Sequence, residues 1–448
     1  MNGMTLERAA KLCGGKIYGE YDKKACLGRI VIDSRAIMPG DVFIAYKGEK
    51  ADGHDYIPMA FEKGAVCCIA QHPVEGETRP LIVTEDVQAA VETIASAYRE
   101  SLSIPVIGIT GSVGKTSAKE MIGAVLYARL NILKTDKNFN NRIGVPMTVS
   151  RIEPEHEAAV IEMGISQFGE MTYLARIARP TVAVFTVIGH AHLEFLGDLD
   201  GVLRAKTEML AMMDDDAVMI CNGDDERLRA FPCRQRKLCF GLSPACDVRA
   251  VNVDMSSPEC VKCDIEYGSR CVHAYIPAYG QHMIYAALAG AAVGFELGLT
   301  DREIEQGIAS YETVGRRGAV TKTERLTLVD DCYNANPDSV KCGIDSLMKL
   351  PGRHVCILSD MLELGEDEAE MHRGVGEYAL EKGIDLVLTC GERSVHTAAG
   401  AGAIARHYPD TDALIKALPE VLEIGDSVLV KASNAMHLER VSEALKGL

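Results

Sequence analysis

Short β-branched apolar runs alternate with helical patterns from about residue 104 to the end of the chain. Such runs predict buried parallel strands, because strands covered on both faces carry apolar residues throughout. The runs lie at 104–110, 158–162, 181–188 and 218–222, and the pattern restarts with runs at 326–329, 355–358, 385–389 and 428–431. Strands that alternate with helices predict parallel α/β sheets, whose ligands lie at the carboxyl ends of the strands.

The first hundred residues differ, because their short strands alternate with turns. A helical pattern at 91–101 precedes Ser103-Ile104-Pro105, which marks a join between domains. Between 231 and 278 the short strands predict an antiparallel excursion, and 280–297 is apolar on every side, as in a buried helix. We therefore expect three α/β domains, at 1–103, 104–315 and 316–448.

Composition narrows the class of protein. The chain has 448 residues and a net charge of −17, which disfavours a general surface for nucleic acid or anionic membranes. No apolar run reaches the length of about 18 residues that a membrane span needs. No apolar segment typical of a secretory signal opens the sequence. We expect a cytoplasmic monomer that binds no nucleic acid.

The 15 cysteines raise the question of a metal site. Cys260-x-x-Cys263, with Cys246 and Cys271 nearby, contains part of a zinc motif. A second C-x-x-C is missing, and His273 has no paired histidine. This pattern favours reduced structural thiols over zinc ligands.

The run at 106–110 leads into Gly111-Ser112-Val113-Gly114-Lys115-Thr116 and then into a helical pattern. In this order of strand, loop and helix, backbone N–H groups bind phosphates, the Lys reaches the outer phosphates and the Thr hydroxyl holds Mg²⁺. The strict pattern G-x-x-x-x-G-K-S/T fails by one place, since its first Gly falls on Ile109. The alternative is a glycine-rich turn, and the flanking strand and helix favour the phosphate loop.

Other polar residues follow the ends of expected strands. Glu162 ends one of them, where a carboxylate beside a phosphate loop is a natural Mg²⁺ ligand. Its alternative role is a strand-end carboxylate that is satisfied within the protein. The loop with Asn138, Asn140 and Asn141 suits a polar ligand, or it is an ordinary Asn-rich turn.

Three further features are ambiguous when each is judged alone. Taken alone, His192 is more simply interpreted as a core or surface imidazole than as a functional residue. Taken alone, Lys206 is more simply interpreted as a solvated charge on a helix. Asp33-Ser34-Arg35 offers oxygen acceptors and a guanidinium, which suit a nucleotide sugar and, equally, a surface turn with a local ion pair.

Together these segments resemble the Mur ligase family, the ATP-dependent amide-forming enzymes of peptidoglycan synthesis. The resemblance covers nearly the whole chain. It is carried by Thr110–Thr116, Gly189–Glu194 through Ala205–Glu208, Asp330–Pro337, Asp360–Gly365, and the amino-terminal Asp33–Arg35 and Asp52–His54. The segment Asp360-Met361-Leu362-Glu363-Leu364-Gly365 points to the branch that adds D-alanyl-D-alanine.

The resemblance implies a P-loop ATPase domain in the centre and a Rossmann-like carboxy-terminal domain. ATP would bind to Gly111, Ser112, Val113, Gly114, Lys115, Thr116 and Ser117. Two Mg²⁺ sites are implied, one at Thr116 and Glu162 and a second at His192. Lys206 would be carbamylated, which turns a cationic amine into a carboxylate-like group that binds or orients the metals. Lys115, Lys206 and His192 would therefore act in catalysis.

The resemblance also implies the substrates. Asp331 would contact the ATP ribose, and Arg316 would lie near the transferring phosphate. Ser34 and Arg35 would belong to the UDP-sugar domain, and Asn138, Asn140 and Asn141 would face the UDP-sugar peptide. The partners would be UDP-N-acetylmuramoyl-tripeptide, D-alanyl-D-alanine and ATP, joined through an acyl phosphate.

Two departures from the family pattern keep alternatives open. Gly280-Gln281-His282 is not followed by the usual Asn, with Ala286 in its place, and Asn434 replaces the usual Arg after Lys431-Ala432-Ser433. One alternative is a sister ligase or a folylpolyglutamate-type ligase that adds a single amino acid. The other is a low-activity homologue that binds wall precursors. Tyr333-Asn334-Ala335-Asn336-Pro337 favours the D-alanyl-D-alanine branch.

Overall fold

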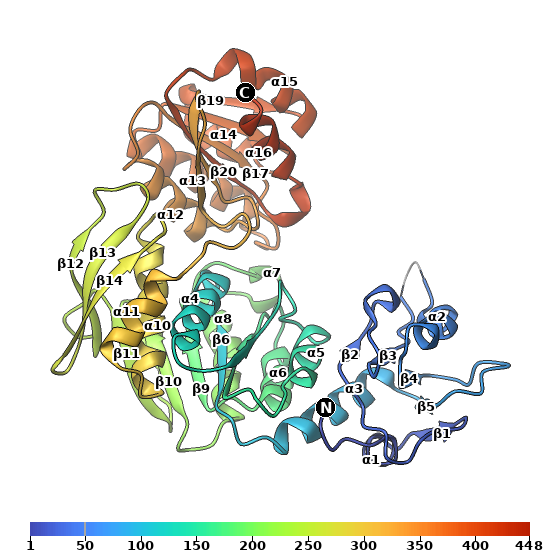
Figure 1. Cartoon of the computed structure of the whole chain (residues 1–448). Coiled ribbons are helices and arrows are strands. Elements are labelled where there is room, and N and C mark those ends of the chain that lie inside the picture. Colours follow the sequence, from blue (N-terminus) through green and yellow to red (C-terminus); the bar gives the residue numbers. More distant parts are fainter. Residues whose placement is uncertain (49–50) are drawn as a thin grey trace.

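The computed structural model describes residues 1–48 and 51–448, in which three β-sheets follow one another along the chain. Figure 1 shows the first group of elements in blue, the second in pale blue through green to yellow, and the third in orange to red. The α/β class expected from the alternating apolar runs is confirmed. Within the described ranges no helix is both long and apolar enough to cross a bilayer.

The first sheet has five strands in the order β1-β5-β4-β3-β2, with β1 antiparallel to β5 and the others parallel. The strands are β1 Lys16–Tyr18, β2 Ile30–Val31, β3 Val42–Ile44, β4 Cys67–Ala70 and β5 Leu81–Val83, and the helices are α1 Leu6–Cys13, α2 Ile57–Glu62 and α3 Val87–Glu100. Helix α3 begins a turn earlier than the apolar pattern predicts. The reason is an N-cap, because the Asp86 carboxylate accepts the backbone N–H of Ala89 at 2.9 Å.

The second sheet has nine strands in the order β14-β13-β12-β11-β10-β9-β6-β8-β7. They are β6 Val106–Thr110, β7 Ile132–Lys134, β8 Ala158–Glu162, β9 Val182–Phe185, β10 Val218–Asn222, β11 Arg236–Gly241, β12 Val248–Asp254, β13 Val261–Tyr267 and β14 Arg270–Ile276. The helices are α4 Lys115–Tyr127, α5 Gly144–Ser150, α6 Glu170–Ala178, α7 Leu193–Leu196, α8 Leu199–Ala211, α9 Glu226–Ala230, α10 His282–Glu296 and α11 Asp301–Ala309.

The expected antiparallel excursion at 231–278 is only partly correct. Strand β11 pairs parallel to β10, and β12 pairs parallel to β11. Antiparallel pairing begins between β12 and β13 and continues to β14 at the sheet edge. The misassignment has a physical reason, because a short apolar strand looks the same from its sequence in either direction of pairing.

Helices pack on both faces of this sheet. Helices α4 and α10 cover one face with a core that includes Ile109, Val184 and Leu288. The close packing of α4 also requires a glycine in α11, since a Cβ on Gly307 would lie 2.3 Å from the Cα of Val125. Side chains of α6 and α8 cover the other face, in a core that continues into the first region of the chain. The strand ends that carry the polar residues therefore sit on a rigid support.

The third sheet has the order β15-β16-β20-β17-β18-β19, parallel except for the β15–β16 pair. Its strands are β15 Ala319–Lys322, β16 Leu326–Asp330, β17 His354–Ser359, β18 Leu386–Cys390, β19 Ala405–Tyr408 and β20 Asp426–Lys431. Its helices are α12 Pro337–Leu347, α13 Glu368–Lys382, α14 Val395–Ala401, α15 Thr411–Val421 and α16 Glu439–Lys446. The carboxyl ends of β16, β17 and β20 lead into segments that face the second sheet.

Candidate active site

The phosphate loop follows β6 directly and ends where α4 begins. Gly111 has a φ of +151° and Gly114 a φ of +83°, which side chains rarely adopt. A Cβ on Gly111 would lie 1.9 Å from Thr186 Oγ1, so the loop can pass β9 only with a glycine here. Gly114 is the N-cap of α4, which directs the helix N-terminus towards the loop. Backbone N–H groups that converge in this way favour an anion.

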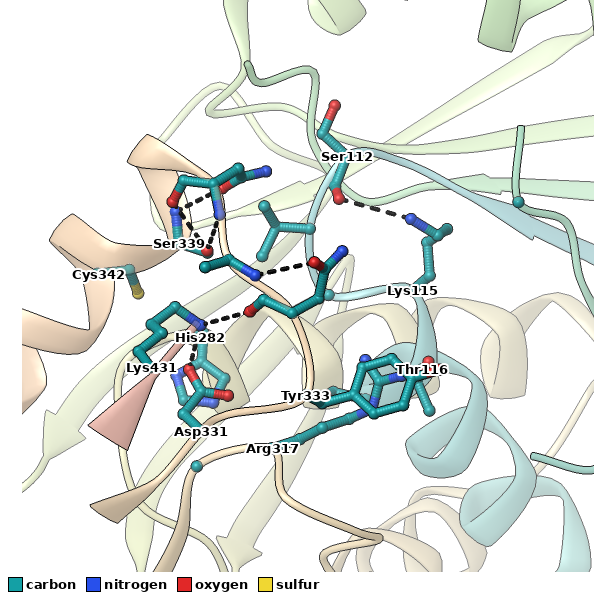
Figure 2. A pocket seen from close by; sticks show the side chains of 18 of the residues that line it. Ser112, Lys115, Thr116, His282, Arg317, Asp331, Tyr333, Ser339, Cys342 and Lys431 are labelled. Carbon is teal, nitrogen blue, oxygen red and sulfur yellow. Dashed lines mark hydrogen bonds and ion pairs between the residues drawn. The ribbon is translucent and has the colours of Figure 1, made fainter. Parts of the chain in front are cut away.

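Lys115 is the first residue of α4, and its side chain folds back over the loop. Its Nζ donates to the carbonyl of Gly111 at 2.7 Å and to that of Ser112 at 3.5 Å, as Figure 2 shows for Ser112. Burial lowers the pKa of Lys115, and the negative charge of Glu162 acts in the opposite direction. The ammonium group therefore lies over the loop, beside a buried carboxylate.

Glu162 ends β8, and its carboxylate is 2% exposed. Its Oε2 accepts a hydrogen bond of 2.9 Å from the Thr116 hydroxyl, and its Oε1 accepts one of 2.8 Å from the Asn140 amide. The Nζ of Lys119 lies 3.8 Å from Oε2 and donates to the carbonyl of Thr135 at 2.9 Å. The carboxylate and hydroxyl next to the phosphate loop are oxygen donors of the type that Mg²⁺ prefers.

Two of the contacts around Glu162 were not predicted from the sequence. Asn140 was expected to face the UDP-sugar peptide, and that role stays a prediction; its hydrogen bond to Glu162 is a further contact that the sequence did not predict. Lys119 was not singled out, although it follows Thr116 by three residues on the same helix and so lies on the same face. Lys119 is 1% exposed, and its burial could not be predicted from the sequence pattern of the helix.

The segment Gly189–Glu194 docks against the third sheet. His190 donates its backbone N–H to Asp338 Oδ2 at 2.7 Å, and its Nδ1 lies 3.0 Å from the same oxygen. His192 has a φ of +58°, and its Nδ1 pairs with Glu363. Asp338 lies in the first turn of α12, and Glu363 lies in the loop after β17. Two carboxylates of the third sheet region therefore hold the loop that carries His192.

Lys206 lies in α8 and is 1% exposed. Its amine makes no hydrogen bond or ion pair with any residue of 1–48 or 51–448. Burial lowers the pKa of Lys206 well below its usual range, and the positive charge of Lys115 lowers it further. The expectation of a solvated surface charge is wrong, because this amine is buried close to the phosphate loop.

A cleft of about 540 Å³ separates the second and third sheets. It is lined by Ser112–Ser117, by Asn138, Asn140 and Asn141, by Glu162 and His192, and from the third region by Arg317, Asp331, Tyr333–Asn336, Glu363 and Lys431. Figure 2 shows the Lys431 ammonium between the Asp331 carboxylate, 2.5 Å away, and the Asn334 carbonyl, 3.1 Å away. Asp331 is thus fixed at the cleft wall opposite Lys115.

Arg316 and Arg317 point in different directions. Arg316 donates to Glu443 at 2.9 Å and to the backbone of α16, away from the lining of the cleft. Arg317 lines the cleft, where its guanidinium stacks 3.8 Å from the ring centre of Tyr333. Arg316 was expected near the transferring phosphate. In this arrangement of the sheets, Arg317 and not Arg316 faces the cleft that the phosphate loop lines.

The two departures from the family pattern fall in different surroundings. Ala286 is 4% exposed and packs in the core beneath α10, so its side chain does not line the cleft. His282, at the start of the same helix, does line it beside Asp331 and Lys431. Burial lowers the pKa of His282, which favours the neutral imidazole. Asn434 is exposed at the end of the loop that follows β20.

A second cavity, of about 530 Å³, lies in the first region. Its lining includes Ser34, Arg35, Tyr56 and, from the second region, Ile143. Arg35 pairs with Asp33 through two hydrogen bonds of 2.9 and 2.8 Å, and this guanidinium lowers the pKa of Asp33 to about 2. The loop that carries the three asparagines lines the main cleft, while Ile143 after it lines this cavity.

Comparison with known proteins gives matches along the entire chain. Residues 28–110 match the description "Mur ligase family, catalytic domain", residues 109–294 match "Mur ligase middle domain", and residues 315–434 match "Mur ligase, glutamate ligase domain". The UDP-N-acetylmuramoyl-tripeptide–D-alanyl-D-alanine ligase of Bacillus subtilis (strain 168) is 33% identical over 98% of this chain and 98% of its own.

Solved structures agree. MurF from Acinetobacter baumannii superposes with a TM-score of 0.91 at 27% identity, covering 99% of each chain. The MurF ligase from Thermotoga maritima, solved in complex with ADP, has a TM-score of 0.85 at 28% identity and covers 95% of this chain and 99% of its own. The similarity therefore includes the complete three-sheet architecture.

Proposed function

The chain belongs to the Mur ligase family, and we propose how its residues join D-alanyl-D-alanine to UDP-N-acetylmuramoyl-tripeptide with the cleavage of ATP. The protein is an ATP-dependent amide-bond ligase of peptidoglycan precursor synthesis. The observation that carries this function is the end-to-end similarity to ligases of that activity, together with a single cleft lined by the phosphate loop and by the third sheet. Ligation of a single amino acid, as in sister ligases or folylpolyglutamate-type enzymes, is not favoured.

ATP binds with its phosphates on the loop 111–117. The support is the two glycines at positive φ, the helix N-terminus behind them and the Lys115 ammonium. On binding, Lys115 would replace its hydrogen bonds to loop carbonyls with hydrogen bonds to phosphate oxygens. Asp331, held in place by Lys431, would accept hydrogen bonds from the ribose hydroxyls across the cleft. Arg317 is better placed than Arg316 to meet the transferring phosphate, because it lines the cleft.

The residues around Glu162 fit Mg²⁺. A carboxylate held between a hydroxyl and an amide offers hard oxygen donors, and His192 can supply a ligand for a second ion. When bound, Mg²⁺ would neutralise charge on the phosphates during transfer. Thr116 and Glu162 would hold one ion, and His192 the other.

Lys206 would be modified by carbon dioxide. The amine must be neutral to add to carbon dioxide, and burial next to Lys115 favours the neutral form by lowering its pKa. The neutral amine adds to the carbon of CO2: one C–N bond forms, one C=O π bond breaks, and one proton leaves the nitrogen, so the neutral side chain becomes an anionic carbamate. A carbamate would attract metal ions that a protonated lysine would repel.

The reaction then proceeds in two transfers. The terminal carboxylate of the tripeptide attacks the γ-phosphorus of ATP, and ADP leaves with the electrons of the broken P–O bond. Lys115 and the loop N–H groups stabilise the charge that develops on the phosphate oxygens. The amine of D-alanyl-D-alanine attacks the acyl phosphate carbonyl, phosphate leaves, and the amine loses a proton as the amide forms.

The third sheet region protects the intermediate. An acyl phosphate hydrolyses if water reaches it, so the cleft must close during the second transfer. The contacts of His190 with Asp338 and of His192 with Glu363 join both walls of the cleft and support this role. The UDP group would lie in the first cavity near Ser34 and Arg35, and its peptide would pass Asn138, Asn140 and Asn141.

We further propose three domains at 1–103, 104–315 and 316–448, each built on one of the three sheets, and a monomer in the cytoplasm. The decisive assay measures phosphate release with ATP, UDP-tripeptide and each candidate amine in turn. Release with D-alanyl-D-alanine supports the function, and release only with a single amino acid would refute it. Binding of the UDP-tripeptide with no turnover would instead support a low-activity homologue. The same assay, run with D-alanyl-D-alanine and UDP-tripeptides that end either in lysine or in diaminopimelate, identifies the natural UDP-tripeptide.

A further inference from the structure

The β13–β14 hairpin carries a cluster of three different metal-binding side chains away from the cleft. Ligand atoms of Asp264, Cys271 and His273 all lie within 4.8 Å of one another. Asp264 pairs directly with His273 across the ladder, and Cys271, two residues before His273, pairs with Glu266. Because side chains alternate along a strand, all four point to the same face of the hairpin.

Four carboxylates lie in or around this cluster, and one of them, Asp301, is paired with Arg270 at 2.6 Å. Asp264, Glu266, Asp301 and Glu305 all lie close enough to the Cys271 thiol to act on it electrostatically. They come from β13 and from α11, which runs along the outer edge of β14. Glu305 also accepts the backbone N–H of His273 at 2.8 Å, so it is held beside the cluster. This concentration of negative charge attracts a cation.

The positions of the ligands are restrained by the sheet. Asn252 of β12 donates its amide to Asp264 Oδ2 at 2.7 Å, which fixes the orientation of the carboxylate. The other oxygen, Oδ1, lies 2.7 Å from Nδ1 of His273. Orienting hydrogen bonds of this kind are typical partners of metal ligands. A tight turn joins the two strands, so they cannot move apart easily.

We propose that Asp264, Cys271 and His273 bind a borderline divalent transition-metal cation such as Zn²⁺. A thiolate with an imidazole selects such an ion over Mg²⁺ or Ca²⁺, which prefer oxygen ligands throughout. The ion would take the place of the proton shared by His273 Nδ1 and Asp264 Oδ1. The His273 side chain is 75% exposed, and its Nδ1 lies 2.7 Å from Asp264 Oδ1. It is free to move away by the roughly 0.6–0.7 Å that two tetrahedral bonds of about 2.0–2.1 Å to one ion require. Glu266, Glu305 or water can complete the coordination.

This site differs from the one that cysteine spacing suggested. Cys260 and Cys263 are both buried, and Cys263 points to the opposite face of β13 from Asp264. The ligands instead gather across two paired strands, which a search for C-x-x-C in one segment does not detect. Figure 1 shows β13 and β14 at the far edge of the second sheet, away from α7. Metal binding there would strengthen the hairpin without touching the substrates.

The test is a titration of the full-length protein with Zn²⁺, in saturating Mg²⁺ and ADP so that the cleft is occupied. We expect one equivalent of Zn²⁺ to bind, and Cys271→Ser and His273→Ala each to weaken binding about tenfold or more. Cys26→Ser removes another exposed thiol and should leave the affinity unchanged. With Co²⁺ as an optical probe, a thiolate charge-transfer band should appear in the wild type and in Cys26→Ser but not in Cys271→Ser.

Any of three results would overturn the proposal. One is Zn²⁺ binding that is unchanged in both Cys271→Ser and His273→Ala. The second is the absence of stoichiometric Zn²⁺ binding in the wild type, and the third is Co²⁺ binding without the thiolate band. Each variant should retain full ligase activity, which shows that it is folded. If Cys271→Ser were to lose activity, His273→Ala and Asp264→Asn carry the test, because both side chains lie at the surface.

Discussion

Removing the amide of Asn140 should weaken the proposed Mg²⁺ site without removing any ligand. Asn140 donates to Glu162 Oε1 at 2.8 Å, and Thr116 donates to the other oxygen at 2.9 Å. With Asn140→Ala, Oε1 of a carboxylate that is 2% exposed loses its only side-chain donor among residues 1–48 and 51–448. The carboxylate is then free to rotate, and its charge is less well stabilised.

The size of the effect follows from the contact. A hydrogen bond to a charged group contributes about 1.5–3 kcal/mol to stability. Asn140 lines the cleft, so water can replace part of the lost interaction, and we take the lower value. About 1.5 kcal/mol corresponds to roughly a tenfold loss of Mg²⁺ affinity. This agrees with the effect of removing residues that orient metal ligands, about 10–100-fold.

The assay is the initial rate of phosphate release as free Mg²⁺ is varied at saturating substrates. We expect Asn140→Ala to raise the Mg²⁺ concentration for half-maximal rate about tenfold. Asn138→Ala is the matched control, because Asn138 lines the same cleft and makes no described contact with Glu162. If Asn140→Ala raised only the KM for UDP-tripeptide and left the Mg²⁺ dependence unchanged, Asn140 would be a peptide contact and this reasoning would be wrong.

Other predictions test other parts of the structure. Lys206→Ala should abolish turnover, and bicarbonate should not restore it, because no amine remains to accept carbon dioxide; full activity would exclude the carbamate. Since burial lowers the pKa of Lys206, ¹³C-bicarbonate NMR should show its carbamate at pH 7, with the signal fading as the pH falls and the amine becomes protonated. Asp338→Ala should lower kcat/KM about fivefold, since it removes two half-exposed hydrogen bonds to His190 worth about 1 kcal/mol together, and unchanged steady-state kinetics would argue against the docking role. In thermal unfolding, Gly374→Ala should stabilise α13 by about 0.5–1 kcal/mol because its Cβ meets open space, whereas Gly376→Ala should destabilise it because its Cβ would lie 2.0 Å from the Thr397 carbonyl.

Much of the architecture was accessible from the sequence alone. Parallel strands buried on both faces carry unbroken apolar runs, so β6, β8, β16 and β20 were located to within a residue or two. The three-domain α/β fold and the ligase activity could be expected because the motif segments are long and occur in order. The boundaries of the three domains and the roles of the site residues stay predictions.

Side-chain direction was the part that the sequence did not contain. Arg316 and Arg317 are adjacent, and only the three-dimensional path of the chain decides which of them enters the cleft. Glu363 was noted as part of a motif, but its pairing with His192 joins positions 171 apart in the chain. Lys206 seemed a solvated charge because a charged residue on an amphipathic helix usually is one. Contacts between distant segments are not visible as local patterns.

If the two cavities bind as proposed, the loop that links them would let the enzyme measure the length of its substrate. Ile143 lines the cavity proposed for the nucleotide, and the asparagines just before it line the cleft proposed for phosphate transfer. A precursor anchored at one end must extend across this fixed interval before its carboxylate meets the γ-phosphate. Precursors with too short a peptide would therefore occupy the anchor and still remain unactivated, and they would inhibit the enzyme by competition.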